Sequence, residues 1–187
     1  MKKKLSILMI LVLAVCMLGG CGSNNTKTET DKVPSKYKND QKVSLILNET
    51  TATLYLPKKN IAQVMAVQSN DERKPINEKN YDFLKEKKIC QIGISSDSNV
   101  LAQYQLTSGK YSKEGLSQLG KVKTLNKKYL YASKKVNDKY VYYIAVPGNK
   151  KFSILLIMES FEKLDDKTII SYADRVVNVK TTKLDAE

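Results

Sequence analysis

The chain of 187 residues contains no histidine and no tryptophan, and it has only three cysteines. The absence of histidine excludes Ser-His-Asp and Cys-His catalysis, histidine-ligated zinc, and the one side chain that ordinarily titrates near neutral pH. The sequence also lacks a Walker-type phosphate loop and a G-x-G-x-x-G dinucleotide motif. These absences exclude several common enzyme classes, and we expect neither a cofactor nor a metal.

Cysteine is scarce in the part of the chain that can fold. Cys16 lies in an apolar N-terminal stretch, Cys21 directly follows that stretch, and Cys90 lies in an apolar run that is typical of a strand. A single cysteine in the folded region cannot form an internal disulfide or a cysteine-cluster metal site. We expect Cys90 to be a small buried residue of that strand.

The first residues have the three parts of an export signal. Lys2 to Lys4 are positive, and Leu5 to Leu18 form an uncharged apolar stretch that is short for a membrane span but suits a signal peptide. The stretch ends in Leu18-Gly19-Gly20-Cys21. This tetrapeptide resembles the lipobox of bacterial lipoproteins, in which an aliphatic residue and two small residues precede a cysteine.

The lipobox resemblance covers about the first 21 residues and implies both a modification and a location. It implies that diacylglycerol is attached to Cys21 and that residues 1–20 are removed by cleavage between Gly20 and Cys21. The two acyl chains would hold the protein on the extracytoplasmic face of the cell membrane. An ordinary secretory signal followed by an accidental cysteine is the alternative.

Residues 21–40 are almost entirely polar, and we expect them to form a flexible linker behind the lipidated cysteine. In an alternative arrangement, the part from about Lys36 packs on the domain as an irregular arm. Residues 41–187 have the length of one domain.

The net charge of +13 comes almost entirely from lysine. Lysine is a mobile, hydrated point charge, whereas arginine forms planar, bidentate contacts with phosphates and carboxylates. The charge suits diffuse attraction to anionic lipid or an anionic wall polymer, although it also suits a merely soluble surface. We do not expect nucleic acid as a partner, because the part after the signal has no basic block and no known binding motif.

Short strand patterns dominate residues 41–187. Asn137-Asp138 is typical of a two-residue turn, and it predicts a hairpin in which Val136 faces Lys139 and Ser133 faces Tyr142. The almost continuously apolar run Phe152 to Met158 indicates a central strand covered on both faces. The segments with strand patterns are Val43–Asn48, Thr51–Leu56, Ile61–Gln68, Ile89–Ser95, Val100–Leu106, Tyr129–Val136, Lys139–Val146 and Phe152–Met158.

Three segments have helical patterns: Asn77 to Lys88, Ser112 to Leu119, and about Asp166 to Val179. Asp165 is placed to cap the last of these, and apolar residues recur along it at helical spacing. The chain is therefore predicted to be an α+β domain. We expect a mainly antiparallel sheet of five to seven strands, with the C-terminal amphipathic helix and one or two shorter helices packed on it.

Five tyrosines fall between Tyr129 and Tyr143. A sheet can present tyrosines as an amphipathic platform, so Tyr129, Tyr131 and Tyr142 are a candidate binding surface. Ordinary core and rim packing is the alternative. Strand alternation places Tyr140 and Tyr142 on the face opposite Tyr143.

Four acids, Glu159, Glu162, Asp165 and Asp166, cluster after the expected central strand. Two carboxylates at a suitable separation can cleave a glycan, so a wall-active glycosidase-like enzyme is one alternative function. Helix capping and solvation are the other explanation for these acids.

The leading hypothesis is a non-enzymatic envelope lipoprotein that binds a ligand, a protein or a wall polymer, or that assists another envelope protein. A structural or developmental role, for example in a spore envelope, is a third hypothesis. The sequence leaves an enzymatic function open, and it does not indicate the oligomeric state.

The lipobox predicts a change in mass that can be measured on the native protein. Cys21 should carry two acyl chains, and radiolabelled fatty acid should appear on the wild-type chain but not on the Cys21→Ala variant. Intact-mass analysis and labelling test this directly. An unmodified thiol at position 21 would contradict the anchoring.

Overall fold

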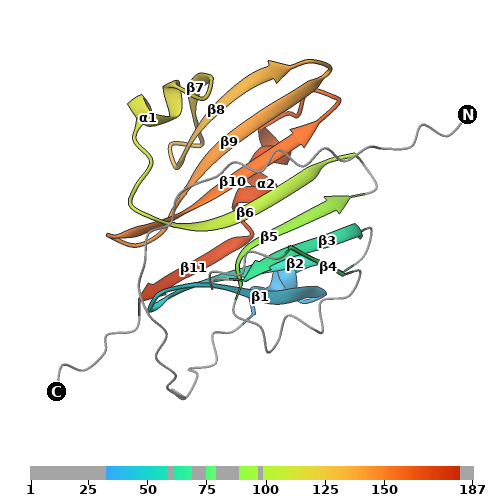
Figure 1. The fold of residues 1–187 in the computed structure, drawn as a ribbon, viewed down its shortest axis with the longest axis vertical. Helices are drawn as coiled ribbons and strands as arrows, with labels where there is room; N and C mark the ends of the chain where they lie inside the picture. Colours follow the sequence, from blue (N-terminus) through green and yellow to red (C-terminus); the bar gives the residue numbers. More distant parts are fainter. Residues whose placement is uncertain (1–32, 59–60, 69–74, 79–88, 97–98, 182–187) are drawn as a thin grey trace, which may run out of the picture.

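One curled sheet dominates the computed structural model of the protein (Figure 1). The structure describes residues 33–58, 61–68, 75–78, 89–96 and 99–181, so residues 1–20 and the lipobox lie outside the described part. The strands are β1 (Asp40–Leu47), β2 (Thr50–Pro57), β3 (Ile61–Gln68), β4 (Pro75–Glu78), β5 (Ile89–Ser96), β6 (Leu101–Ser108), β7 (Lys121–Leu125), β8 (Tyr129–Val136), β9 (Lys139–Pro147), β10 (Phe152–Ser160) and β11 (Val176–Thr181). The helices are η1 (Ser35–Tyr37), α1 (Lys113–Ser117) and α2 (Asp166–Ala173).

Nine strands follow the order β11-β2-β1-β5-β6-β10-β9-β8-β7, while β3 and β4 branch from β5. All described pairs are antiparallel except β1 with β5. The prediction of a mainly antiparallel sheet with few helices is confirmed. The expected number of five to seven strands is wrong. The short strands β4 and β7 lack the period-2 pattern by which longer strands are recognised, and β11 falls where the apolar spacing predicts a helix.

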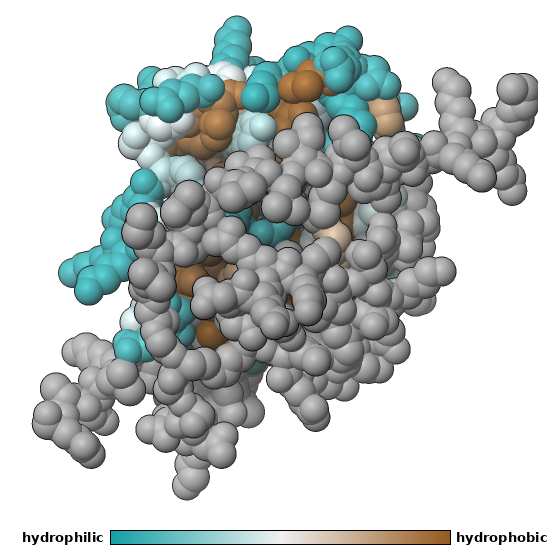
Figure 2. Space-filling model, in the orientation of Figure 1, coloured by the Kyte–Doolittle hydropathy of each residue, from teal (hydrophilic) through white to brown (hydrophobic). Residues whose placement is uncertain are grey.

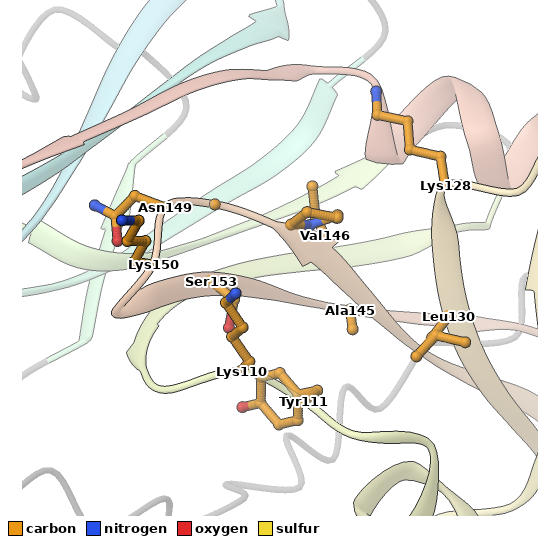
Figure 3. Close-up of a pocket in the computed structure, with 11 residues that line it drawn as sticks. Lys110, Tyr111, Lys128, Leu130, Ala145, Val146, Asn149, Lys150 and Ser153 are labelled. Atoms are coloured by element: carbon orange, nitrogen blue, oxygen red, sulfur yellow. The ribbon is translucent and has the colours of Figure 1, made fainter.

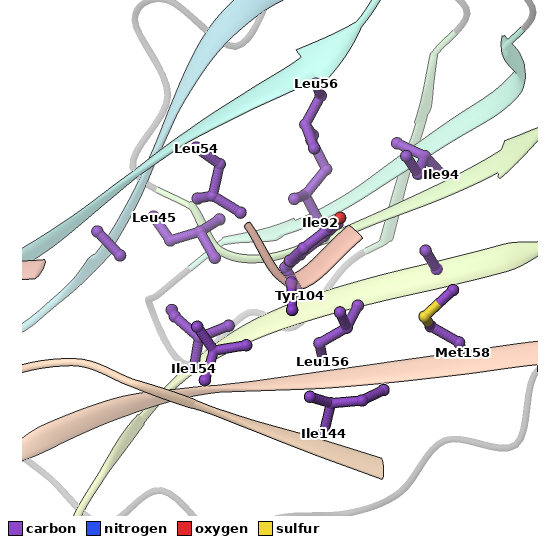
Figure 4. Packing of buried hydrophobic residues seen from close by; sticks show 14 of the residues in the cluster. Leu45, Leu54, Leu56, Ile92, Ile94, Tyr104, Ile144, Ile154, Leu156 and Met158 are labelled. Carbon is purple, nitrogen blue, oxygen red and sulfur yellow. The ribbon is translucent and has the colours of Figure 1, made fainter. Parts of the chain in front are cut away.

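The main core lies on the face of the sheet that α2 covers. Leu54, Ile92, Tyr104, Ile144 and Leu156 come from five strands and are fully buried together. Figure 4 shows their side chains converging between the strands. Ile169 and Ala173 of α2 are fully buried in the same cluster. Burial of this continuous apolar face is the main source of stability for the domain.

A smaller core lies on the opposite face of β8, β9 and β10, where α1 packs. Leu116 of α1 is buried with Tyr143, Leu155 and Ile157. Residues Phe152 to Met158 are all buried, which confirms the prediction of a central strand covered on both faces.

The hairpin between β8 and β9 has the expected register. Val136 faces Lys139 and Ser133 faces Tyr142. Asn137 has a φ of 55°, the left-handed conformation that asparagine tolerates in such a turn. The neighbouring strands β1 and β2, and likewise β5 and β6, also form antiparallel pairs.

The predicted C-terminal helix is wrong beyond Ala173. Asp165 caps α2 through a side-chain bond from the Thr168 amide at 2.7 Å, as expected, but the helix stops after eight residues. The chain then forms β11, which pairs with β2. The β-branched valines of Val176-Val177-Asn178-Val179 favour a strand, and pairing with β2 satisfies backbone groups that would otherwise be exposed at an edge.

Two other predictions change at their boundaries. Asn77 and Glu78 belong to β4, so the helix expected from Asn77 does not begin there, and its remainder to Lys88 lies outside the described residues. In the presumed linker, η1 is ordered and Tyr37 is only 6 % exposed. The alternative arrangement, an arm that packs on the domain, is therefore the one seen for residues 35–40.

No helix in the described ranges has both the length and the apolar character needed to cross a bilayer.

Candidate functional site

A pocket of about 570 Å³ opens where β8 begins and β9 ends. This volume is in the range of small-molecule binding sites. Its lining comes from four segments: the β6–α1 connection, the start of β8, the end of β9, and the β9–β10 turn with the start of β10. The residues are Lys110, Tyr111, Lys128, Leu130, Ala145, Val146, Pro147, Gly148, Asn149, Lys150 and Ser153.

The floor of the pocket is apolar and rests on the sheet. Leu130 of β8 and Ala145 of β9 are cross-strand partners, and both belong to the smaller core. Figure 3 shows Ala145 and Leu130 on neighbouring strands, with Lys128 at one side of them and Lys110 and Lys150 at another.

The walls of the pocket are held by hydrogen bonds. The Asn149 side-chain oxygen accepts the amides of Lys151 and Phe152, each at 2.9 Å, which closes the β9–β10 turn. The Asn149 side-chain amide donates to the Thr181 hydroxyl of β11 at 2.8 Å. Ser153 donates to the Gly109 carbonyl at 2.8 Å and fastens the loop that carries Lys110. The walls are thus set by contacts within the protein.

The rim of the pocket is positively charged. Lys110, Lys128 and Lys150 are exposed and line the pocket, whereas none of its lining residues is acidic. The whole segment 109–151 has eleven lysines and only two acids, Glu114 and Asp138. In Figure 2, hydrophilic side chains cover much of the surface over α1, β7 and β8, with apolar ones between them. The pocket therefore suits a ligand that combines a negative charge with an apolar part.

Beside the pocket, the Asp174 carboxylate joins three distant parts of the chain. It accepts hydrogen bonds from the Tyr129 hydroxyl and from Lys128 Nζ at 3.3 Å, and Lys36 Nζ lies 3.9 Å from its other oxygen. The Tyr37 hydroxyl donates to the Asp174 backbone carbonyl at 2.7 Å. We call Lys36, Tyr37, Lys128, Tyr129 and Asp174 the Asp174 cluster.

Burial and hydrogen bonding act in opposite directions on the pKa of Asp174. Burial raises it, but the hydrogen bonds from Tyr129 and Lys128 and the positive charges of Lys128 and Lys36 outweigh burial and lower it below the usual 3.8. The pKa of the Tyr129 hydroxyl is raised. Burial is the largest cause, and the hydrogen bond to Asp174 is the second. At neutral pH the pair is therefore a neutral tyrosine donating to a carboxylate.

A second set of contacts continues from the Asp174 cluster to β1 and β2. The rings of Tyr37 and Tyr55 stack with centroids 5.6 Å apart. Arg175 donates to Asp40 at 2.7 Å and to the Tyr55 carbonyl at 2.9 Å. The segment that leads into β1 is thus fixed against the junction of α2 and β11.

The tyrosines predicted as a binding surface are part of the core. Tyr129, Tyr131 and Tyr142 are 0, 4 and 3 % exposed. The segment that leads into α2 covers them, because the Leu164 amide donates to the Tyr142 hydroxyl at 2.8 Å and α2 packs in the same cluster. The surface prediction is therefore corrected in favour of core packing. Tyr142 and Tyr143 do lie on opposite faces, as expected.

Two of the four clustered acids have structural contacts. Glu159 forms an ion pair with Lys139 at 3.4 Å, and Asp165 caps α2. Among the described residues, no group of three or more histidine, cysteine, aspartate or glutamate side chains is placed to hold a metal ion. Cys90 lies in β5 as predicted, but it is half-buried rather than fully buried.

Sequence reasoning did not find the pocket, because its lining comes from segments that only the sheet topology brings together. Two signals were available. One is the excess of lysine in residues 109–151, and the other is the Pro147-Gly148-Asn149-Lys150 turn, which carries four of the lining residues.

Comparison with protein-family models, curated proteins and solved structures finds no match for the chain.

The Asp174 cluster predicts a stability difference that depends on pH. Asp174→Asn should lower the free energy of unfolding at pH 7 by about 1–2 kcal/mol, since a charge-assisted bond to Tyr129 is weakened. The folded pKa of Asp174 is lowered, so its contribution is fully present above the unfolded pKa of 3.8 and is lost as pH falls through the folded pKa. Urea unfolding of both proteins from pH 7 to about pH 2.5 measures the difference.

Asp138→Asn is the matched control for this experiment, because Asp138 is an exposed carboxylate in the β8–β9 turn. Its effect should stay within about 0.5 kcal/mol. A difference between wild type and Asp174→Asn that persists unchanged at the lowest pH would contradict the assigned role of the carboxylate.

Proposed function

We propose that this protein is a lipid-anchored lipoprotein of the extracytoplasmic face of the cell membrane, and that it acts by binding rather than by catalysis. The signal-like N-terminus and the lipobox resemblance at Leu18 to Cys21 support the anchoring. The binding role is supported by the pocket at the start of β8.

The observation that carries the binding role is the combination of charge and apolar surface in that pocket. Lys110, Lys128 and Lys150 line the pocket together with the apolar Leu130 and Ala145, and the lining contains no carboxylate. Lysine interacts with an anion as a mobile point charge and does not impose one fixed geometry. The expected ligand therefore has a phosphate or carboxylate group next to a short apolar part.

The three lysines are not equivalent in this proposal. Lys128 lies 3.3 Å from the Asp174 carboxylate and 4.6 Å from the centroid of the Tyr129 ring, so its charge is partly compensated within the protein. Lys110 and Lys150 come from the β6–α1 connection and the β9–β10 turn, which the Gly109 amide joins by donating to the Lys151 carbonyl at 2.6 Å. We assign the main anion contacts to Lys110 and Lys150.

Octyl phosphate and octyl glucoside test the pocket, because they share an apolar chain and differ in the charge of the head. Octyl phosphate, used below the concentration at which it forms micelles, should bind at least about ten-fold more tightly than octyl glucoside. Lys110→Gln/Lys150→Gln should reduce its affinity by about ten-fold, as expected for two partly screened charges. Isothermal titration calorimetry measures the affinities.

Lys134→Gln/Lys135→Gln is the control, since it removes the same charge near the β8–β9 turn, away from the pocket. Its affinity for octyl phosphate should remain within about two-fold of wild type. Equal binding of the two ligands, or an equal loss in both double variants, would refute the assignment of the pocket.

A further inference from the structure

Six exposed lysines gather at one end of the sheet. The antiparallel registers place the end of β6, the start of β8, the end of β9 and the start of β10 at this end. The connections there carry Lys110, Lys127, Lys128, Lys150 and Lys151, and the Asp174 cluster adds Lys36. We call these six residues the basic end. Asp174 forms ion pairs with Lys36 and Lys128.

The opposite end of the same strands has mixed charge. The β8–β9 turn holds Asp138 beside Lys139, and Lys139 is paired with Glu159 at the end of β10. Glu162, Asp165 and Asp166 follow in the connection to α2 and its first turn. Lys134, Lys135, Lys163 and Lys167 also lie toward this opposite end, so lysines and carboxylates alternate there, whereas the six lysines of the basic end face the single carboxylate of Asp174.

The Asp174 cluster also fixes where the N-terminal segment meets the domain. Lys36 and Lys128 contact the same carboxylate, and Tyr37 is bonded to the Asp174 carbonyl. Eleven residues, 22–32, separate Cys21 from Val33, the first described residue. Even fully extended, they span only about 40 Å. Because Lys36 and Tyr37 are bound at Asp174, the chain that leads back to Cys21 starts beside the basic end.

We propose that the basic end docks onto the anionic phospholipid headgroups of the bilayer that carries Cys21, with the pocket turned toward the headgroups. This proposal rests on the lipid anchoring proposed above. In this orientation, the ligand of the pocket is a phospholipid. Its phosphate is the anionic part, and its glycerol and the start of its acyl chains are the apolar part.

The position of the anchor favours a bilayer over a soluble anionic polymer as the partner. A tether of this length keeps the domain at a high effective concentration near the membrane surface, so a modest attraction is enough to orient it. Each lysine close to an anionic bilayer strengthens binding about five-fold, and salt screens the attraction. Six lysines, two of which share the Asp174 carboxylate, therefore favour an orientation with the basic end toward the bilayer.

The docking can be tested without the lipid anchor. The whole mature polypeptide, residues 21–187 with Cys21→Ser, is sedimented with vesicles of phosphatidylcholine alone or with about one quarter phosphatidylglycerol. We expect binding only to the vesicles that contain phosphatidylglycerol. Lys127→Gln/Lys151→Gln should weaken it about 25-fold at low salt, from about five-fold for each lysine. Lys134→Gln/Lys135→Gln, with the same loss of charge at the other end, should weaken it less than about three-fold.

The variants distinguish membrane docking from the two earlier proposals, which are the lipidation of Cys21 and the binding of a ligand in the pocket. Lys127 and Lys151 do not line the pocket, so octyl phosphate should bind the Lys127→Gln/Lys151→Gln variant as it binds wild type. Because no acyl chain is present, the result does not depend on whether Cys21 is lipidated. Far-UV circular dichroism and thermal unfolding confirm that each variant folds.

Three results would overturn the docking. The first is an equal loss of vesicle binding in both double variants, which would indicate attraction by net charge alone. The second is equal binding to vesicles with and without phosphatidylglycerol. The third is tighter binding to soluble poly(glycerol phosphate) than to vesicles at equal phosphate concentration, which would assign the basic end to a wall polymer.

Discussion

The Asp174 carboxylate links the end of α2 to the segment before β1 and to the start of β8. It accepts a hydrogen bond from Tyr129 at the start of β8 and ion-pairs with Lys128 beside it and with Lys36 in the N-terminal segment. Its own position is set by the end of α2, where the Asp174 amide donates to the Ile170 carbonyl at 2.8 Å. Residues separated by more than 130 positions are thereby held together, at the point where the N-terminal segment joins the domain.

The location of Asp174 follows from where α2 stops. If the helix continued to Val179, as its apolar spacing predicts, Asp174 and Arg175 would lie within it, and β2 would lack β11 as a partner. Instead α2 ends after Ala173, and the Arg175 carbonyl accepts the Tyr55 amide at 3.1 Å. A tertiary requirement, the pairing of an open strand edge, outweighs a local helical pattern here.

Features that depend on neighbours in sequence could be predicted, and features that depend on topology could not. The β8–β9 hairpin, the buried strand β10 and the cap at Asp165 follow from a turn dipeptide, an apolar run and a capping residue, and all three were found. Core packing of Tyr131 and Tyr142 was one of the two alternatives from the sequence, and alternation within a strand could not decide between them because it does not say which face α2 will cover. The pocket requires the order β6-β10-β9-β8, which no local pattern gives.

The basic end contains the candidate pocket and lies beside the N-terminal segment of the described domain. Lys110 and Lys150 border an apolar floor, and Lys36 marks where the N-terminal segment meets the domain. Lysine suits this role, because a long, mobile, hydrated charge can adapt to a fluid surface of phosphates without one fixed geometry. In this account, the contact that orders the N-terminal segment also turns the pocket toward the membrane.

Spin labels on the acylated protein in vesicles would measure that orientation directly. Labels are placed singly at Lys127→Cys in the basic end and at Asp138→Cys in the opposite turn, with Cys90→Ala to remove the remaining thiol. A nickel-chelating lipid in the bilayer reports how close each label lies to the headgroups. If the basic end faces the bilayer, nickel-dependent relaxation should be strong at position 127 and weak at position 138. Equal relaxation at the two positions, or stronger relaxation at 138, would contradict it.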